Sequence, residues 1–356
     1  MKHIFLFLSL VVFLLSKGQT AYFTDKNWNY FNIFSEDRIV KAEFIPIVEA
    51  KYGKDYVAYI RNNNRFIIST NGEQKDMNIV NPKFYAKDNI LAYFVDEQLW
   101  ILENGKVQFL CPWVETNFAL GDEILCFTNM YGEFKVYYQD STYIIGQWAV
   151  NQIKTGDNTI VYLDNNNIFK IFYEGEVTFL ESNPPLTYKT SKDILAYVSN
   201  LNDFIVWYKG ETNTLMYQKP SWYEVGEEFV AYIDDMEQFK VWYKGETIEL
   251  MSIKPKDVLI KENVMVYTDD FGNFYCFYKG KVSRLAPYTP TKFQLDNDIV
   301  VFRDNYGYLK GMFNGETTSF SKEIATDFEL FNHTVVYRLD NVKWKVYNNG
   351  NYYNYP

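Results

Sequence analysis

Hydrophobic and aromatic residues recur along this chain with a period of about 35 residues. An aromatic residue closes a short apolar run at nine positions, and the steps between them are 34, 34 and then 35 six times. These positions are Tyr59, Tyr93, Phe127, Tyr162, Tyr197, Tyr232, Tyr267, Phe302 and Tyr337. A fixed period of this length indicates one supersecondary unit repeated many times. The pattern therefore predicts a repeat architecture.

A glycine follows most of these aromatic residues at a constant distance. It stands thirteen residues further on, or twelve in the second copy, and only the copy around Phe127 has Asp140 instead. The glycines are Gly72, Gly105, Gly175, Gly210, Gly245, Gly280, Gly315 and Gly350. Four of them form Asn-Gly pairs, which favour two-residue hairpins because both residues tolerate left-handed backbone angles. Each glycine is thus expected at a hairpin turn.

One copy, residues 254–283, illustrates the predicted unit. Short apolar or aromatic runs cover residues 258–261, 264–268 and 274–278, and a more polar run follows from 281 to about 285. β-Branched and aromatic residues separated by Asn, Asp and Gly are typical of strands and turns. No stretch after the N-terminal region has sustained helical spacing. Each copy therefore predicts four short antiparallel strands.

The fourth strand of each copy joins the next copy through a longer link that often contains proline. Tight hairpins inside a unit and a longer link between units are typical of a β-propeller, whereas solenoid coils use parallel strands. The fold class is thus all-β, a propeller-like array of about nine to ten repeats. Nine copies are clear, and an eroded copy lies at about residues 21–50 without its first strand. A closed ring, an open ring and two arcs remain alternatives.

The first residues are typical of a secretory signal peptide. Lys2 and His3 precede an apolar run of twelve residues, and small residues at 16 and 18 predict cleavage before Gln19. The expected organisation is a signal peptide at residues 1–18 and a single repeat domain at 19–356. No later stretch is long and apolar enough to predict a membrane span. The mature chain is expected to be soluble and exported.

The charge of the chain limits its partners. Cleavage removes Lys2 and Lys17, which leaves 33 basic and 45 acidic residues and a net charge of −12. Such a surface repels phosphate, so nucleic acid and anionic lipid are not expected partners. The three cysteines, at 111, 126 and 276, do not form a disulfide framework for a chain of this size.

Candidate chemistry is sparse. The mature chain holds one histidine, His333, which is expected at a turn, and it contains no zinc or copper ligand set and no phosphate-binding glycine loop. Acidic turns recur at residues 164–167, 234–235, 269–270 and 304–305. Their oxygens suit Ca²⁺, but turns prefer Asp and Asn for structural reasons as well. We therefore expect no catalytic residue, no metal and no cofactor, and calcium at these turns stays an alternative.

Aromatic residues in the links between units are the candidate binding residues. Tyr and Trp combine a large apolar area with a hydrogen-bonding group, which suits protein interfaces and sugar platforms. The candidates are Trp113, Trp148, Trp222, Tyr223 and Tyr288. A purely structural role, in which they cover the grooves between units, remains open.

The chain resembles exported repeat proteins of the Bacteroidota. The resemblance rests on the predicted signal before Gln19, on a composition rich in Asn, Lys, Tyr and Phe, and on repeats such as residues 241–246. It implies a periplasmic location, because the last repeat reaches the C-terminus without a sorting domain and no lipoprotein cysteine follows the signal. An extracellular location is the alternative.

These observations predict a non-enzymatic binding protein or scaffold that docks on an outer-membrane or envelope complex. One such role, implied by the resemblance, is to cap the periplasmic mouth of a protein-secretion channel, as the plug component of the type IX translocon does. A glycan-binding propeller is the main alternative. A polysaccharide-active enzyme on a propeller is the third.

Overall fold

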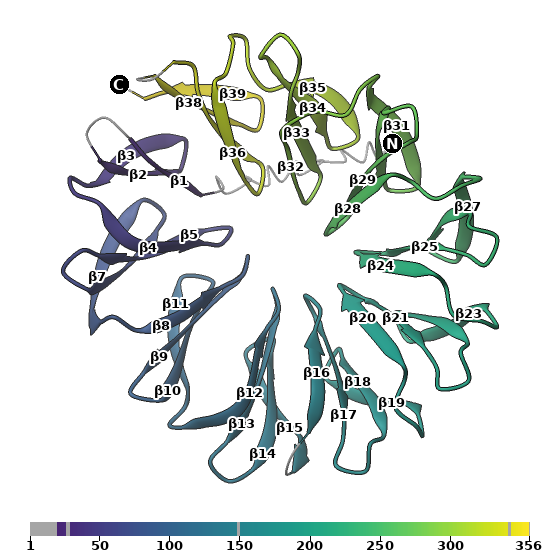
Figure 1. The fold of residues 1–356 in the computed structure, drawn as a ribbon. Helices are drawn as coiled ribbons and strands as arrows, with labels where there is room; N and C mark the ends of the chain where they lie inside the picture. The colour runs from purple at the N-terminus through teal and green to yellow at the C-terminus, as the bar shows by residue number, and fades with distance from the viewer. Residues whose placement is uncertain (1–19, 26–28, 148–149, 341–342, 356) are drawn as a thin grey trace, which may run out of the picture.

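The computed structural model describes residues 20–25, 29–147, 150–340 and 343–355. The predicted signal peptide, residues 1–18, lies outside them. Ten antiparallel sheets form a ring around a central opening (Figure 1). No helix within the described ranges is long and apolar enough to cross a membrane.

The first blade has three strands, and each of the other nine is a four-stranded meander in which consecutive strands pair. Blades one to four contain β1 (Ala21–Thr24), β2 (Phe31–Ser35) and β3 (Arg38–Glu43); β4 (Ile47–Tyr52), β5 (Tyr56–Arg61), β6 (Arg65–Thr70) and β7 (Glu73–Val80); β8 (Lys83–Ala86), β9 (Ile90–Val95), β10 (Gln98–Glu103) and β11 (Lys106–Cys111); and β12 (Val114–Leu120), β13 (Ile124–Asn129), β14 (Glu133–Tyr138) and β15 (Ser141–Gln147).

Blades five to seven contain β16 (Asn151–Thr155), β17 (Thr159–Leu163), β18 (Phe169–Tyr173) and β19 (Glu176–Glu181); β20 (Thr187–Ser191), β21 (Ile194–Val198), β22 (Phe204–Tyr208) and β23 (Glu211–Met216); and β24 (Trp222–Gly226), β25 (Phe229–Ile233), β26 (Phe239–Tyr243) and β27 (Glu246–Met251). Blades eight to ten contain β28 (Asp257–Lys261), β29 (Val264–Thr268), β30 (Phe274–Tyr278) and β31 (Lys281–Ala286); β32 (Phe293–Asp296), β33 (Ile299–Arg303), β34 (Leu309–Phe313) and β35 (Glu316–Ser319); and β36 (Asp327–Phe331), β37 (Thr334–Arg338), β38 (Trp344–Asn348) and β39 (Asn351–Asn354).

The predicted repeat unit is confirmed, and the number of blades is ten. The eroded first copy lacks its innermost strand among the described residues, as expected. Its predicted end near Ala50 is wrong. The first blade ends at Glu43, because Ile47–Tyr52 pairs with Tyr56–Arg61 as the innermost strand of the second blade.

The 35-residue period reflects one aromatic contact repeated between neighbouring blades. In seven of the nine copies the periodic aromatic residue packs on an aromatic residue at the first or second position of the third strand of the preceding blade. Phe169 and Tyr197 are a representative pair, with ring centroids 5.4 Å apart, and Phe204 and Tyr232 repeat the contact at 5.5 Å. Both tyrosines are buried. Tilted or edge-to-face ring contacts stabilise the fold beyond the burial of apolar area alone. The repeated aromatic residue therefore stabilises the packing of each blade on the next.

The ring closes through the same contact. Phe23 of β1 packs on Trp344 of β38 with ring centroids 5.1 Å apart, and both belong to one buried cluster shared by the first and tenth blades. The Tyr353 hydroxyl also donates a hydrogen bond to the Asp37 carboxylate at 2.6 Å. Side-chain packing between two separate sheets therefore joins the ends of the ring.

Three aromatic rings fill the space beside the three-stranded blade. Tyr22 of β1 lies 5.0 Å from Phe331 and 6.1 Å from Tyr52, measured between ring centroids, and the latter two rings are 5.0 Å apart. Tyr52 and Phe331 come from the innermost strands on either side. The place of Tyr22 in other blades is held by small residues, namely Ala58, Ala92, Cys126, Val161, Ala196, Ala231, Val266, Val301 and Val336. The large ring thus occupies volume that a fourth strand fills elsewhere.

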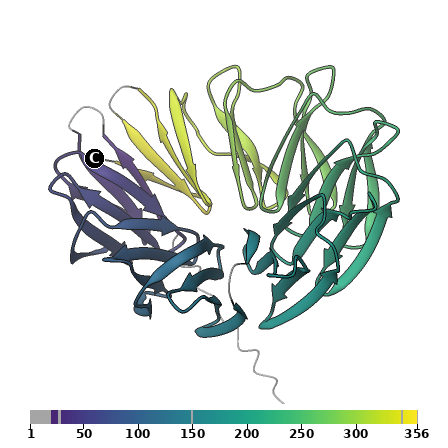
Figure 2. The same cartoon turned by 60° about the horizontal axis from the view of Figure 1, so that its bottom comes forward.

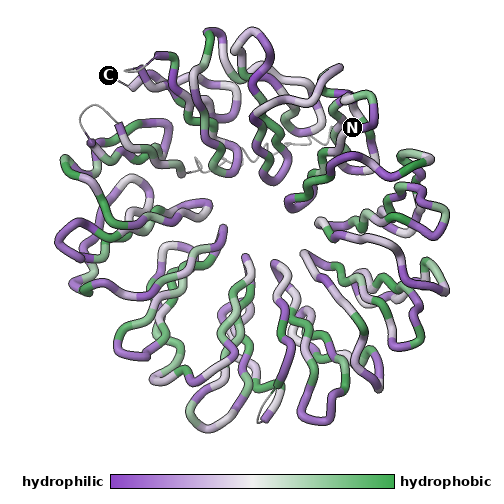
Figure 3. The backbone as a smooth tube through the Cα atoms, viewed as in Figure 1, coloured by the Kyte–Doolittle hydropathy of each residue, from purple (hydrophilic) through white to green (hydrophobic). Residues whose placement is uncertain are grey.

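The meander topology gives the ring two distinct ends. Hairpins between first and second strands, and between third and fourth strands, lie at one end, here called the hairpin face. Turns between second and third strands, and links between blades, lie at the other, the tip face. The blades are inclined so that their inner ends converge (Figure 2). Hydrophilic residues gather at the outer hairpins, and hydrophobic residues in the strands between (Figure 3).

Candidate functional site

The turns of the tip face are held by an acidic or polar side chain. Asp234 is buried, and its Oδ1 accepts hydrogen bonds from the backbone N–H groups of Met236 and Gln238, both at 2.9 Å. Its Oδ2 pairs with the Lys240 ammonium at 2.6 Å. Burial opposes the charged form, but Lys240 and the two N–H groups hold the pKa of Asp234 below its usual value.

The same arrangement recurs around the ring. The side chain that begins the turn accepts from the N–H groups two and four residues further on in Asn129, Asp164, Ser199, Asp234 and Asp304. Lys170 and Lys310 pair with Asp164 and Asp304 as Lys240 does with Asp234. These carboxylates already bind the turn backbone and a lysine, which explains the acidic turns without calcium. Their result is a rigid turn.

Each rigid turn presents the residue two places after its first residue. In five blades that residue is apolar or aromatic and exposed: Tyr131, Leu201, Met236, Phe271 and Tyr306. Phe271 is 91% exposed. The links add further exposed apolar side chains: Phe44, Ile45, Trp113, Leu186, Tyr217, Ile253 and Ile324. The tip face thus carries large apolar side chains on most of its circumference.

The hairpin face is different. Within the described ranges, every exposed large apolar side chain that lies outside the strands belongs to the tip face, and none belongs to a hairpin of the other end. The hairpins carry Asn, Glu, Lys and Gly instead. A surface patch of exposed apolar side chains marks an interaction site more often than scattered ones do. The tip face is therefore the candidate binding surface.

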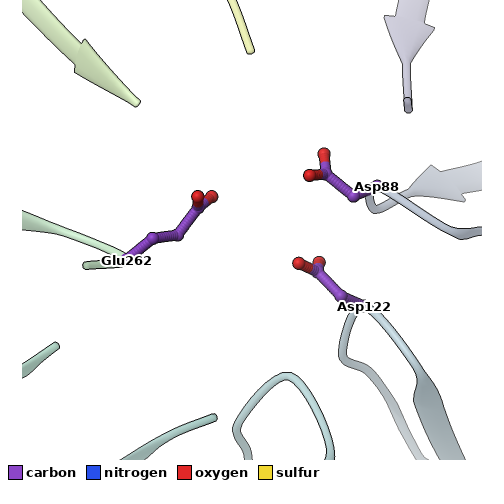
Figure 4. Close-up of side chains that lie close together, drawn as sticks. All are labelled: Asp88, Asp122 and Glu262. Atoms are coloured by element: carbon purple, nitrogen blue, oxygen red, sulfur yellow. The ribbon is translucent and has the colours of Figure 1, made fainter. Parts of the chain in front are cut away.

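The inner hairpins meet at a narrow neck of the hairpin face. Asp88 and Asp122 come from the third and fourth blades, and Glu262 comes from the eighth blade across the opening (Figure 4). One oxygen of each lies within 4.8 Å of the other two. Neighbouring hairpins are also in close contact, since a Cβ on Gly156 would lie 2.2 Å from the Ser191 carbonyl oxygen.

Burial and mutual repulsion shift the acidity of the neck. Burial and the nearby Asp122 and Asp296 raise the pKa of Asp88 to about 6. Burial, Asp296 and Asp88 raise the pKa of Glu262 to about 10. Burial also raises the pKa of Asp122, and it raises the pKa of Asp157 and Glu227 to about 7 each, with help from neighbouring carboxylates.

Carboxylates in this arrangement can share protons or hold a hard cation such as Ca²⁺. Several neck groups already have partners. The Asn297 N–H donates to Glu262 Oε2 at 3.0 Å, and Lys192 pairs with Glu123 at 2.9 Å. The inner hairpins of the neck therefore surround a cluster of carboxylates whose negative charge is partly neutralised. Sequence analysis did not single out these residues.

The five aromatic residues predicted as binding residues do not lie together. Trp113 is 49% exposed in the link after the third blade. Trp222 is half-buried against Phe239, at 6.4 Å between ring centroids. Trp148 lies outside the described residues.

The other two candidates contact the core. Tyr223 is 7% exposed, packs on Phe204, and its hydroxyl donates to Thr187 Oγ1 at 2.9 Å. Tyr288 is half-buried, and its hydroxyl accepts from the Asn305 N–H at 3.3 Å. Both contacts fit the structural alternative, in which the aromatic residues cover the grooves between units. A binding role for the five stays a prediction.

The exposed turn residues were missed at the sequence level. Their signal is an apolar residue two places after Asp, Asn or Ser in a turn, where polar residues are expected. Met236 and Phe271 fit this description in sequences of Asp, Asp and then the apolar residue. The pattern is visible without a structure once the turn is located.

Comparison with known proteins identifies the architecture. Residues 14–353 match the sequence model of the 10-bladed beta propeller domain. The chain belongs to this family. No curated protein matches the sequence.

Several solved structures share the propeller fold at low identity. The computationally designed Ika8 protein is 17% identical over 77% of this chain and 95% of its own, with a TM-score of 0.33. The tricorn protease is 9% identical over 95% of this chain and 46% of its own, also at 0.33. PorZ, a surface component of the type-IX secretion system of Porphyromonas gingivalis, is 10% identical over 90% of this chain and 56% of its own, at 0.28. Similarity at this level concerns the fold alone.

Proposed function

We propose that this propeller is a non-enzymatic docking scaffold that binds a large protein partner through its tip face. The observation that carries the proposal is the ring of exposed apolar side chains in the turns and links of the tip face, which the hairpins of the opposite face lack among the described residues. Turns fixed before binding lose little conformational entropy on association, so they favour binding. Exposed aromatic side chains such as Tyr217, which is 87% exposed, are the kind of residue that dominates interfaces.

The location that we propose is the periplasm, after removal of residues 1–18. The partner is then an outer-membrane or envelope complex. A broad ring-shaped face fits a partner that is itself wide, and the periplasmic mouth of a protein-secretion channel is one such surface. The evidence for this location is the sequence of the N-terminal region.

Purification from native envelopes tests the proposal. The tagged protein is extracted in mild detergent, and the proteins that remain bound to it are quantified. We expect an envelope protein in stoichiometric amount. Recovery of the propeller alone, after chemical cross-linking in intact cells has also failed to capture a partner, would refute the docking role.

Glycan binding is the second candidate. It rests on Trp113, whose ring is about half exposed in a link. On this reading Trp113→Ala or Trp222→Ala abolishes binding to a glycan array and leaves the fold intact. An array on which the wild-type protein binds nothing removes this candidate.

A further inference from the structure

A cleft interrupts the tip face at the third blade. It has a volume of about 730 Å³ and lies between the link that follows β7, the end of β9 and the beginning of β12. Its cause is a shortened turn. Asp96 and Glu97 alone join β9 to β10, both with positive φ, whereas three residues, 130–132, join β13 to β14 in the fourth blade and five, 164–168, join β17 to β18 in the fifth. The turn of the third blade is therefore shorter than those of the two blades that follow it.

Three aromatic rings line the floor of the cleft. Phe118 lies 5.0 Å from Tyr85 and 5.1 Å from Phe94, and Tyr85 and Phe94 are 6.2 Å apart, all between ring centroids. All three are half-buried. Phe94 and Phe118 also pack on the buried cluster between the third and fourth blades, which fixes them in place.

The rim of the cleft is acidic. Asp96, Glu97 and Glu115 are exposed there, and Lys83 is the basic residue among the lining side chains, so three negative charges face one positive charge. The Lys83 ammonium already lies 5.5 Å from the centre of the Tyr85 ring. Aromatic faces attract ammonium and guanidinium groups, and carboxylates do the same.

We propose that this cleft anchors a segment of the protein partner in which an apolar or aromatic side chain is flanked by Lys or Arg. The proposal rests on the docking function proposed above and names the chemistry of its anchor. The apolar side chain enters the three-ring floor, and the basic residues pair with the rim carboxylates. The mutual edge-to-face and tilted packing of the rings forms a cup for a compact side chain, whereas a sugar platform needs a free flat face.

Peptides of defined sequence test the cleft directly. Fluorescein-labelled KKLFKK, EELFEE and KKGGKK are titrated with the full mature protein, and anisotropy is recorded at low and at physiological salt. We expect KKLFKK to bind at least tenfold more tightly than either of the other two, and more weakly at the higher salt. Equal binding of all three peptides, or no binding of KKLFKK, would overturn the proposal.

Two variants locate the site and separate its parts. Glu97→Lys with Glu115→Lys reverses the rim charge, so it should lose at least tenfold in affinity for KKLFKK and gain affinity for EELFEE. Tyr85→Ala should weaken the binding of KKLFKK several-fold. The thermal unfolding of this variant is measured to confirm that it is folded. Glu211→Lys with Glu246→Lys, at exposed positions beside hairpins of the opposite face, is the matched charge-reversal control and should bind KKLFKK as the wild type does. Loss of binding in this control, or no loss in the charge reversal of the rim, would contradict the assignment.

The outcome separates this proposal from the docking function. An envelope partner that the charge-reversed protein still recovers in full would refute the cleft and leave docking by the tip face intact. Retention on a glycan array that Tyr85→Ala abolishes would also refute it, in favour of a carbohydrate.

Discussion

The two faces of the ring use their side chains in opposite ways. At the neck of the hairpin face, carboxylates such as Asp88 and Glu262 point inward and are partly buried, so their charges act on the protein itself. On the tip face, Asp234 and its equivalents are buried under the turns, and apolar residues such as Phe271 point outward. The partly buried carboxylates of the hairpin face therefore affect the stability of the protein, whereas the exposed apolar side chains of the tip face are available to a partner.

The two faces can differ in this way only if both belong to one closed ring. Substitution of Tyr22 tests the closure and should have the largest effect on the free energy of unfolding. Tyr22→Ala removes the ring that meets Tyr52 and Phe331 beside the three-stranded blade. By analogy with large-to-small core substitutions, we expect a loss of about 3 kcal/mol in the free energy of unfolding, measured in urea. Tyr306→Ala, exposed on the tip face, should cost less than about 0.5 kcal/mol. Equal effects of the two would refute the filling role of Tyr22.

Removal of a carboxylate that holds a tip-face turn should have the next largest effect on the free energy of unfolding. Asp234→Ala leaves two backbone N–H groups and the Lys240 ammonium without their acceptor. We expect it to reduce the free energy of unfolding by about 2 kcal/mol. Its neighbour Asp235 is exposed, so Asp235→Ala should stay within about 0.5 kcal/mol of the wild type. A neutral Asp234→Ala would show that the turn does not depend on its carboxylate.

The neck predicts a dependence of stability on pH. Glu262 and Asp88 have pKa values of about 10 and about 6 in the folded protein, both above the values of an unfolded chain. The folded state therefore binds more protons between about pH 4 and pH 10, and stability must fall as the pH rises through this range. We expect a loss of at least about 1 kcal/mol between pH 5 and pH 9 in calcium-free buffer.

Substitution of one neck carboxylate should flatten this dependence. Glu262→Gln removes the group with the highest pKa and keeps its shape. We expect its unfolding free energy to vary less between pH 5 and pH 9 than that of the wild type. A steeper dependence in the variant, or stability that rises with pH in the wild type, would contradict the account of the neck.

The smallest effect on stability is expected at the tips themselves. The triple variant Tyr217→Asp, Phe271→Asp and Tyr306→Asp changes three exposed side chains that contribute little to the core. We expect the free energy of unfolding to change by less than about 0.5 kcal/mol per site. A large loss would show that these residues support the fold and would weaken their assignment to binding.

Much of the fold followed from the sequence, because the hairpin glycines and the periodic aromatic residues act locally or between adjacent repeats. The copy at residues 254–283 was divided into strands almost as the structure has it. The neck was not predictable in this way. Asp88 and Glu262 are five blades apart along the chain and meet only because the ring closes with inclined blades.

Which of the link aromatic residues are exposed could not be predicted from the sequence, for a related reason. Tyr223 was assigned to a link between units, but it lies within β24, where its ring packs on Phe204 of the preceding blade. Residues within strands can also be exposed, as Phe109 and Phe179 are, so exposure depends on the direction of the individual side chain and not on its element alone.

The most direct test of the docking role compares the two faces in one experiment. The triple tip variant and a matched variant of the hairpin face, Asn104→Asp with Asn314→Asp and Asn349→Asp, each add three negative charges at exposed turns. Both are purified from native envelopes beside the wild type, and the bound partner is quantified. We predict that the tip variant loses at least nine-tenths of the partner, on the order of 1.4 kcal/mol or more, while the hairpin variant retains it. Equal recovery by the two variants would contradict docking through the tip face.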